Sequence, residues 1–221
     1  SIHEVGCIMR HIHSKSATAF AMAIWSSASE KGHRAATLSL ARHLIQSGIY
    51  GRVPHLRGVE ARYKQLVRGG EDADALTAEG ELLFEQARYE GAATLLRRAL
   101  RIGGQDFPWR AHCELCLGKA YARMGRTEEA EEVLRRLGDE GMVEADVELV
   151  NLWARNCMQG NEAEQEAEQR MYTAACHGKS DMFTRLAEEE LDKKDDGERT
   201  AEERRLWATE WSRLADQRAE Y

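Results

Sequence analysis

Hydrophobic and polar positions alternate at helical spacing along almost the whole chain. Apolar side chains recur every three or four residues with charged residues between them, which is typical of amphipathic α-helices. Glycines such as Gly32, Gly48 and Gly178 fall where these segments should end. The pattern predicts helices over about 2–14, 17–31, 34–47, 58–69, 73–86, 89–102, 109–124, 127–138, 143–158, 161–177, 179–192 and 200–219.

Small residues recur at a fixed offset within this pattern. Gly80 and Ala92 are separated by the same distance along the chain as Gly118 and Ala130, and the two pairs are spaced by about 38 residues. Where two antiparallel helices cross closely, a larger side chain would push them apart. We therefore expect consecutive helices to form hairpins that cross at these positions.

The repeat resembles two related families. The run Leu117-Gly118, Tyr121, Gly125, Ala130 and Leu134 is similar to the tetratricopeptide repeat, and AIWSSASEKGHRAATLSLA over residues 23–41 is similar to Sel1-like repeats. The resemblance implies an all-α, right-handed α-solenoid of about six antiparallel helix pairs. We expect the solenoid to cover residues 1–197 and a C-terminal capping helix to cover 198–221, with Thr200 and Glu203 forming a capping box at the start of that helix.

Charge and composition argue against some classes of function. The chain has 31 basic and 38 acidic residues, and its formal net charge of -7 disfavours a protein built to neutralise phosphates. No apolar run approaches the roughly 20 residues that a membrane span needs. The cysteines are five, an odd number, in a chain that can build its own core, so we expect them to be reduced and mostly buried. This favours a reducing intracellular compartment, the cytoplasm or the mitochondrial matrix.

Two groups of residues could in principle bind a metal. Cys113 and Cys116 have the spacing of half a zinc or redox site, but a second half is missing from the sequence. His3, Cys7 and His11 share one face of a helix. Buried cysteines and exposed histidines explain both groups more simply, so we expect neither metal nor cofactor.

Catalytic motifs are also missing. The sequence contains no glycine-rich phosphate loop, no Ser-His-Asp arrangement and no HExxH motif. Neighbouring carboxylates on a helix point in different directions and are typical of a solvated face. We therefore expect a protein that is not an enzyme.

The resemblance instead implies a binding groove. In these families the first helix of each pair lines the concave face, which here would place on it Arg42, Asp74, Thr77, Glu81, Phe84, Leu115, Lys119, Arg123, Val150 and Met158. The face would run from mixed through acidic and basic to apolar, and would suit a peptide or helix with a basic end and an apolar end. Glu81 stands where family members that grip a chaperone's carboxylate tail have Asn, so that specific role is disfavoured.

The last predicted helix carries an apolar stripe of Leu206, Trp207, Trp211 and Leu214. The simpler interpretation is that this helix caps the solenoid with its tryptophans buried. Alternatively, Trp207 or Trp211 stays exposed as a docking anchor for another protein.

These observations favour a non-enzymatic scaffold or adaptor that binds a protein partner, in the assembly or regulation of a larger complex. Two alternatives remain at this stage: an RNA-binding helical-repeat factor, which the acidic net charge disfavours, and a regulatory helical module of a larger enzyme. The chain begins with Ser1 and enters a helical pattern directly, which favours a fragment or a processed form of a longer protein. The oligomeric state stays open.

Overall fold

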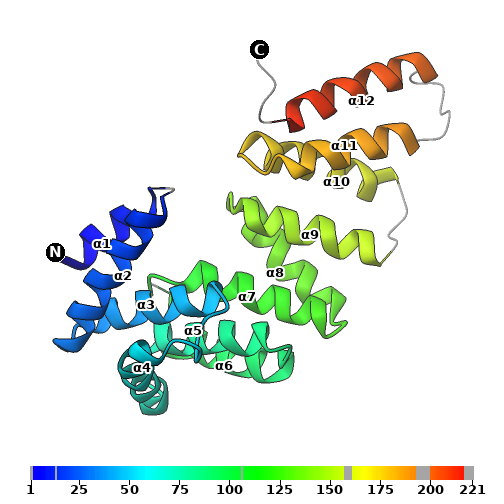
Figure 1. Cartoon of the computed structure of the whole chain (residues 1–221). Coiled ribbons are helices and arrows are strands. Elements are labelled where there is room, and N and C mark those ends of the chain that lie inside the picture. The colour runs from blue at the N-terminus through cyan, green and yellow to red at the C-terminus, as the bar shows by residue number, and fades with distance from the viewer. Residues whose placement is uncertain (1, 13, 106, 157–160, 193–199, 217–221) are drawn as a thin grey trace. The chain divides into compact units, whose positions relative to one another are not determined.

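A computed structural model describes residues 2–12, 14–105, 107–156, 161–192 and 200–216, and in these ranges every regular element is a helix. The elements are, in chain order, α1 (Ile2–Arg10), α2 (Lys15–Glu30), α3 (Arg34–Gln46), the short 3₁₀ helix η1 (Pro54–Leu56), α4 (Arg57–Gly69), α5 (Ala73–Glu85), α6 (Tyr89–Gly103), α7 (Arg110–Arg123), α8 (Thr127–Asp139), α9 (Val143–Arg155), α10 (Asn161–Cys176), α11 (Asp181–Asp192) and α12 (Ala201–Ala215) (Figure 1). The all-α prediction is confirmed.

Helix ends follow local capping chemistry, and this explains the small differences from the prediction. The first helix ends at Arg10 rather than at residue 14, because Ser14 takes the extended backbone of the N-cap of α2. The predicted capping box at Thr200 and Glu203 is confirmed. The 3₁₀ helix was not predicted; Pro54 begins it with the fixed backbone angle that suits a first helical turn.

The chain divides into two compact units, Ser1–Met124 and Gly125–Tyr221, which we call unit 1 and unit 2. Unit 1 contains α1 to α7 and unit 2 contains α8 to α12. The division expected from the sequence, 1–197 and 198–221, stays a prediction.

Small residues let the helices of unit 1 approach each other closely. A Cβ atom added at Gly80 in α5 would lie 2.6 Å from Cγ of Leu96 in α6, so a larger side chain cannot enter without moving this buried leucine. Ala92 in α6 is fully buried. The crossing predicted for Gly80 and Ala92 is therefore a close contact between α5 and α6.

Packing within unit 1 arranges the helices in two layers. The first helices of successive pairs lie next to each other, because α3 contacts α5 and α5 contacts α7. The second helices, α4 and α6, pack against them from the other side, with Tyr63 of α4 and Leu96 of α6 fully buried. One face of the layer formed by α3, α5 and α7 remains outside this core, and it carries the candidate site.

Unit 2 is a series of helices in which each contacts the next, from α8 to α12. Its core contains Val150 of α9, Met171 of α10, and Met182, Phe183 and Leu186 of α11. Trp211 of α12 packs against this core.

Candidate functional site

Polar side chains from three neighbouring helices meet on the face formed by α3, α5 and α7. Arg42 comes from α3, Glu81 from α5 and His112 from α7. Arg42 Nε donates to Glu81 Oε2 at 3.2 Å, and Arg42 Nη2 lies 2.8 Å from His112 Nε2. The contacts therefore join three successive repeats through one guanidinium group.

Arg42 contacts both His112 of α7 and Trp109, the N-cap of that helix. A guanidinium group has only hydrogen-bond donors, so its close contact requires a lone pair on His112 Nε2. Arg42 also lies over the ring of Trp109, with its Cζ 5.0 Å from the ring centroid, which adds a cation–π contact.

Glu81 is a buried charge that the surrounding groups stabilise. Only 8% of the residue is exposed, and Gln46 donates from Nε2 to its Oε1 at 3.0 Å. Burial by itself would raise the pKa of Glu81, but the polar groups around it, His112, Arg42 and Gln46, lower this pKa below its usual value. Glu81 is therefore a paired carboxylate at neutral pH.

Cys116 lies beside this group and Cys113 does not. The Sγ atom of Cys116 is 3.4 Å from His112 Nε2, whereas the thiol of Cys113 points to the carbonyl oxygen of Leu96 at 3.5 Å. Burial raises the pKa of the Cys116 thiol to about 12 and that of the Cys113 thiol to about 11. The two cysteines have different surroundings, and both thiols are free.

One turn further along α7, the same face carries a cation and an aromatic ring. Lys119 Nζ lies 5.4 Å from the ring centroid of Phe84 in α5. Both side chains are half-buried, and Arg123 at the end of α7 is exposed. This part of the face offers positive charge next to apolar surface.

Other residues expected on the groove lie in the helix packing instead. Thr77 is fully buried and donates to the carbonyl oxygen of Ala73 at 2.8 Å, and Leu115 is also buried. Asp74 is buried and pairs with Arg34 at 2.7 Å. Val150 belongs to the core of unit 2. Met158 lies outside the described residues.

Sequence reasoning had not singled out Gln46 and Trp109. Gln46 follows Arg42 by one helical turn, so its spacing could have placed it on the same face. Trp109 is the N-cap of α7 and was predicted as the first residue of the helix over 109–124, where the periodicity does not yet assign a side chain to a face.

The two groups considered for metal binding do not assemble in the way their spacing suggested. His3 Nε2 contacts Ser39 Oγ at 2.9 Å and Cys7 Sγ at 3.6 Å, while His11 is exposed. In the part of the chain that the structure describes, the ligand-type atoms that do come together are those of Glu81, His112 and Cys116.

A shallow depression of about 620 Å³ lies at the start of α5. Arg34 lines it and donates to Asp72 through two hydrogen bonds of 2.6 Å, from Nε to Oδ2 and from Nη2 to Oδ1. These contacts and the pair with Asp74 tie the start of α3 to the start of α5.

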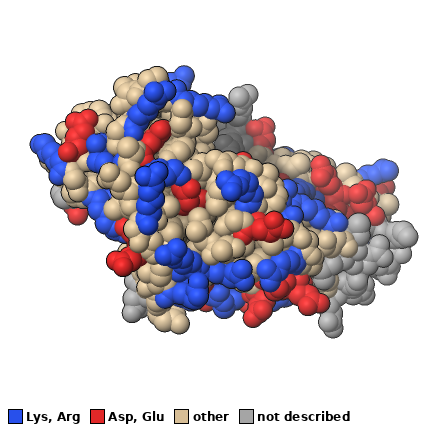
Figure 2. Space-filling view, turned by 90° about the horizontal axis from the view of Figure 1, so that it is seen from below, with Lys and Arg blue, Asp and Glu red and all other residues tan. Residues whose placement is uncertain are grey.

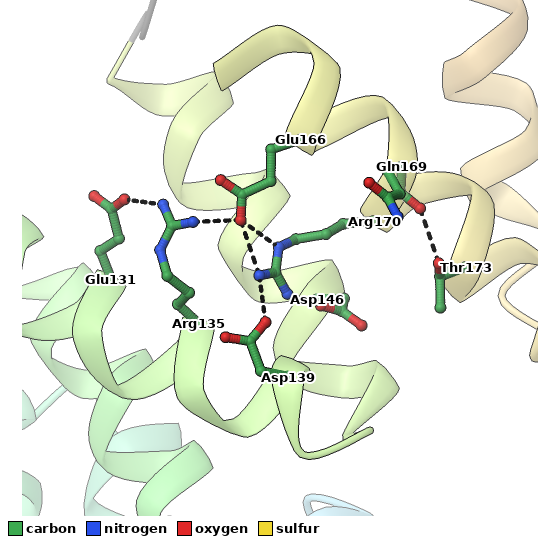
Figure 3. A network of polar contacts seen from close by, with 8 residues as sticks. All are labelled: Glu131, Arg135, Asp139, Asp146, Glu166, Gln169, Arg170 and Thr173. Atoms are coloured by element: carbon green, nitrogen blue, oxygen red, sulfur yellow. Dashed lines mark hydrogen bonds and ion pairs between the residues drawn. The ribbon is translucent and has the colours of Figure 1, made fainter. Parts of the chain in front are cut away.

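The polar network of unit 2 is a cross-link between its own helices (Figure 3). Arg170 of α10 contacts Asp146 of α9 at 2.6 Å and Asp139 of α8 at 2.7 Å. Glu166 accepts from Arg170 at 2.9 Å and also from Arg135 of α8. Because Asp146 is buried and both arginines are engaged, this network is best explained as joining α8, α9 and α10.

The two tryptophans of α12 have different surroundings. Trp211 is half-buried, stacks on Phe183 with 5.8 Å between ring centroids, and meets Tyr172 edge-on at 5.9 Å. Trp207 is 44% exposed and lies 5.6 Å from Trp211. The structure therefore places Trp211 in the packing of unit 2 and Trp207 at its surface.

Surface charge is mixed. On the face seen in Figure 2, Lys and Arg side chains are interspersed with Asp and Glu side chains. An interface built to follow a phosphate backbone would need a stripe of one sign.

Comparisons with known proteins agree with the helical-repeat architecture. Residues 83–150 match the family model of the tetratricopeptide repeat. No curated protein matches the chain in sequence. Within the described residues, no helix is both long enough and apolar enough to cross a membrane.

Three solved structures have similar folds. One is PilF from Pseudomonas aeruginosa, with a TM-score of 0.62 and 19% identity over 95% of this chain and 86% of that chain. Another is a Sel1 repeat protein from Oxalobacter formigenes, with a TM-score of 0.61 and 17% identity over 97% of this chain and 85% of that chain. The third is YrrB, described as a tetratricopeptide repeat protein with an unusual peptide-binding site, with a TM-score of 0.50 and 18% identity over 81% of this chain and 83% of that chain.

Proposed function

We propose that this chain, which carries tetratricopeptide repeats over residues 83–150 within a tetratricopeptide/Sel1-like helical-repeat fold, is a non-enzymatic scaffold that binds a protein partner. Repeat folds of this kind generally serve as protein-interaction scaffolds. The binding surface in our proposal is the face of α3, α5 and α7. We place its role in the assembly or regulation of a larger complex.

The observation that carries this proposal is the set of partly accessible side chains on one face of three neighbouring helices. Arg42, Trp109, Phe84 and Lys119 are all half-buried there, and Arg123 is exposed beside them. Rigid helices hold these groups, so little conformational entropy is lost when a ligand binds them. Aromatic rings and cations are also the residue types that contribute most to binding at protein interfaces.

We propose a different charge for the partner than the sequence suggested. A basic segment was expected because Asp74 and Glu81 were assigned to the groove. Both carboxylates are buried and already paired, with Arg34 and Arg42 respectively. The same face carries the cations Lys119, which is half-buried beside Phe84, and Arg123, which is exposed, so we propose a peptide segment that combines a carboxylate with an apolar or aromatic side chain.

YrrB, a tetratricopeptide repeat protein with an unusual peptide-binding site, supports a peptide ligand by likeness of fold. The free, buried thiols of Cys113 and Cys116 are compatible with a reducing intracellular compartment, which we propose as the setting.

The test is a pair of charge reversals in unit 1. Lys119→Glu changes the proposed face, and Arg97→Glu makes the same charge change at an exposed position of α6. We expect Lys119→Glu to remove a specific protein from affinity purifications while Arg97→Glu retains it, with both variants folded by circular dichroism. Partners that bind the wild type and both variants equally would contradict the proposed face. Salt-sensitive retention of mixed RNA in filter binding would instead favour the RNA-binding alternative.

A further inference from the structure

Three different metal-ligand groups converge on the face of α5 and α7. We propose that Glu81, His112 and Cys116 form a binding site for a divalent transition-metal ion such as Zn²⁺. The ligand atoms of these residues all lie within 4.8 Å of one another. The site does not depend on the identity of the protein partner proposed above.

Two of the three distances between the ligand atoms match those around a tetrahedral ion. Zinc bonds of ordinary length at tetrahedral angles separate two ligand atoms by roughly 3.4 Å for nitrogen and oxygen and roughly 3.6 Å for sulfur and nitrogen. Here His112 Nε2 lies 3.4 Å from Glu81 Oε1 and 3.4 Å from Cys116 Sγ. Glu81 and Cys116 lie within 4.8 Å of each other, so an ion could bind all three atoms after a side-chain movement that brings this third pair to the tetrahedral distance.

The ligand set has the right chemistry as well. A thiolate, an imidazole nitrogen and a carboxylate oxygen are all common ligands of zinc, and three protein ligands leave a fourth position for water or another donor. The 2.8 Å contact with the Arg42 guanidinium fits the tautomer with a lone pair on His112 Nε2, which is also the form that binds a metal. Gln46 holds Glu81 Oε1 in place by a hydrogen bond and leaves that oxygen a second lone pair.

His112 Nε2 and Glu81 Oε1 lie 3.4 Å apart, and a cation beside both atoms stabilises this arrangement. In the structure that cation is Arg42. Its guanidinium contacts both Glu81 and His112, so the metal and the guanidinium would compete for one position.

Entry of the metal requires two changes. Arg42 has to turn away from Glu81, and its side chain is 27% exposed at the edge of the cluster beside Trp109. The Cys116 thiol has to release its proton to the solvent, so that the thiolate sulfur forms the bond to the metal. The helix backbones of α5 and α7 can stay in place.

The experiment is a titration of the full chain with Co²⁺. A phosphine that does not bind metals keeps the cysteine thiols of the protein reduced. Cobalt bound by a thiolate has a charge-transfer absorption in the near ultraviolet. We expect this band at a ratio of one ion per chain, and we expect Zn²⁺ to remove it. Cys116→Ser and His112→Gln should lose the band, while the matched control Cys113→Ser should keep it.

Arg42→Met tests the competition directly. Removal of the guanidinium takes a positive charge from the cluster, so we expect cobalt to bind at least about tenfold more tightly. Circular dichroism shows whether each variant is folded, and the uncharged Arg42→Gln replaces Arg42→Met if the latter does not fold. The proposal is overturned if wild type and Arg42→Met both lack the band, if Cys116→Ser keeps it, if Cys113→Ser loses it, or if Arg42→Met does not tighten binding.

Discussion

Ala87 is the residue at which sequence and backbone conformation conflict most clearly. It lies in the turn between α5 and α6 with a positive φ of 58°, which is the left-handed region. The turn one repeat later has Gly125 with φ of 75°. A side chain in this conformation costs about 1 kcal/mol, because its Cβ approaches the following carbonyl oxygen.

We therefore expect Ala87→Gly to stabilise the protein. Relief of the strain should exceed the extra entropy that glycine gives the unfolded chain, for a net gain of about 0.5 kcal/mol in the free energy of unfolding. Urea denaturation followed by circular dichroism measures this gain. Gly125→Ala is the matched reverse change and should lower the free energy of unfolding. A loss of stability in Ala87→Gly would contradict the assigned turn conformation.

Single residues also show how far sequence reasoning reached. The small side chains of Gly80 and Ala92 could be assigned to a helix crossing because their spacing recurs, and spacing encodes distance between helices. The periodicity of apolar residues predicts the direction of a side chain around its helix axis only to within part of a turn. Thr77 and Leu115 could therefore be assigned to the correct helices, but their burial depends on tertiary packing.

The positions of the helices could be predicted because residues within or next to each helix mark it in the sequence. Apolar periodicity gives the body of a helix, while residues such as Asp72 and Thr200 give its start. The cluster of Arg42, Glu81 and His112 was not predictable in this way. Its contacts span three helices, and they depend on how α3, α5 and α7 pack.

The link between α3 and α5 should depend on pH. Asp72 is the N-cap of α5 and accepts from the backbone nitrogen of Ala75 at 3.0 Å, while Arg34 of α3 donates to both carboxylate oxygens. Burial alone would raise the pKa of Asp72, but the hydrogen bonds from Arg34 and Ala75 lower it below its usual value. The charged form of Asp72 is therefore favoured by folding.

Asp72→Asn keeps the N-cap and removes the charge. A carboxylate whose pKa is lower in the folded state stabilises the protein above the unfolded pKa of about 3.9, and this stabilisation is lost as the pH falls through the folded pKa. Because Arg34 is half exposed, we expect a difference of only about 1 kcal/mol between wild type and variant at pH 7. Urea denaturation at descending pH should show this difference disappearing below about pH 4. A difference that persists unchanged in strong acid would contradict the ion pair.

At the scale of the whole molecule, the sequence repeat does not predict where the chain divides into compact units. The repeat continues through residues 110–139, and the turn at Gly125 resembles the other turns, so no local signal marks the end of unit 1 at Met124. Compactness depends on which residues contact one another in three dimensions. A sequence with near-identical turns does not encode that division locally.

The two units should respond differently to a substitution in the core of unit 2. Trp211 stacks on Phe183 and packs against the core around Met171 and Met182, so Trp211→Ala should cost about 2 kcal/mol in local stability. In repeat folds, a residue stabilises mainly its own unit and its neighbours. We expect faster amide hydrogen exchange in α10, α11 and α12, and little change in α5 and α6.

Hydrogen exchange measured by mass spectrometry resolves these segments separately. Trp207→Ala is the control, because Trp207 is at the surface of the same helix and its removal should alter exchange much less. Equal loss of protection in α5, α6 and α11 after Trp211→Ala would mean that the chain opens as one cooperative body. Protection lost only around α11 would instead show that each helix is stabilised mainly by its neighbours in the stack. Unit 2 could then unfold locally while the face of α3, α5 and α7 keeps its geometry.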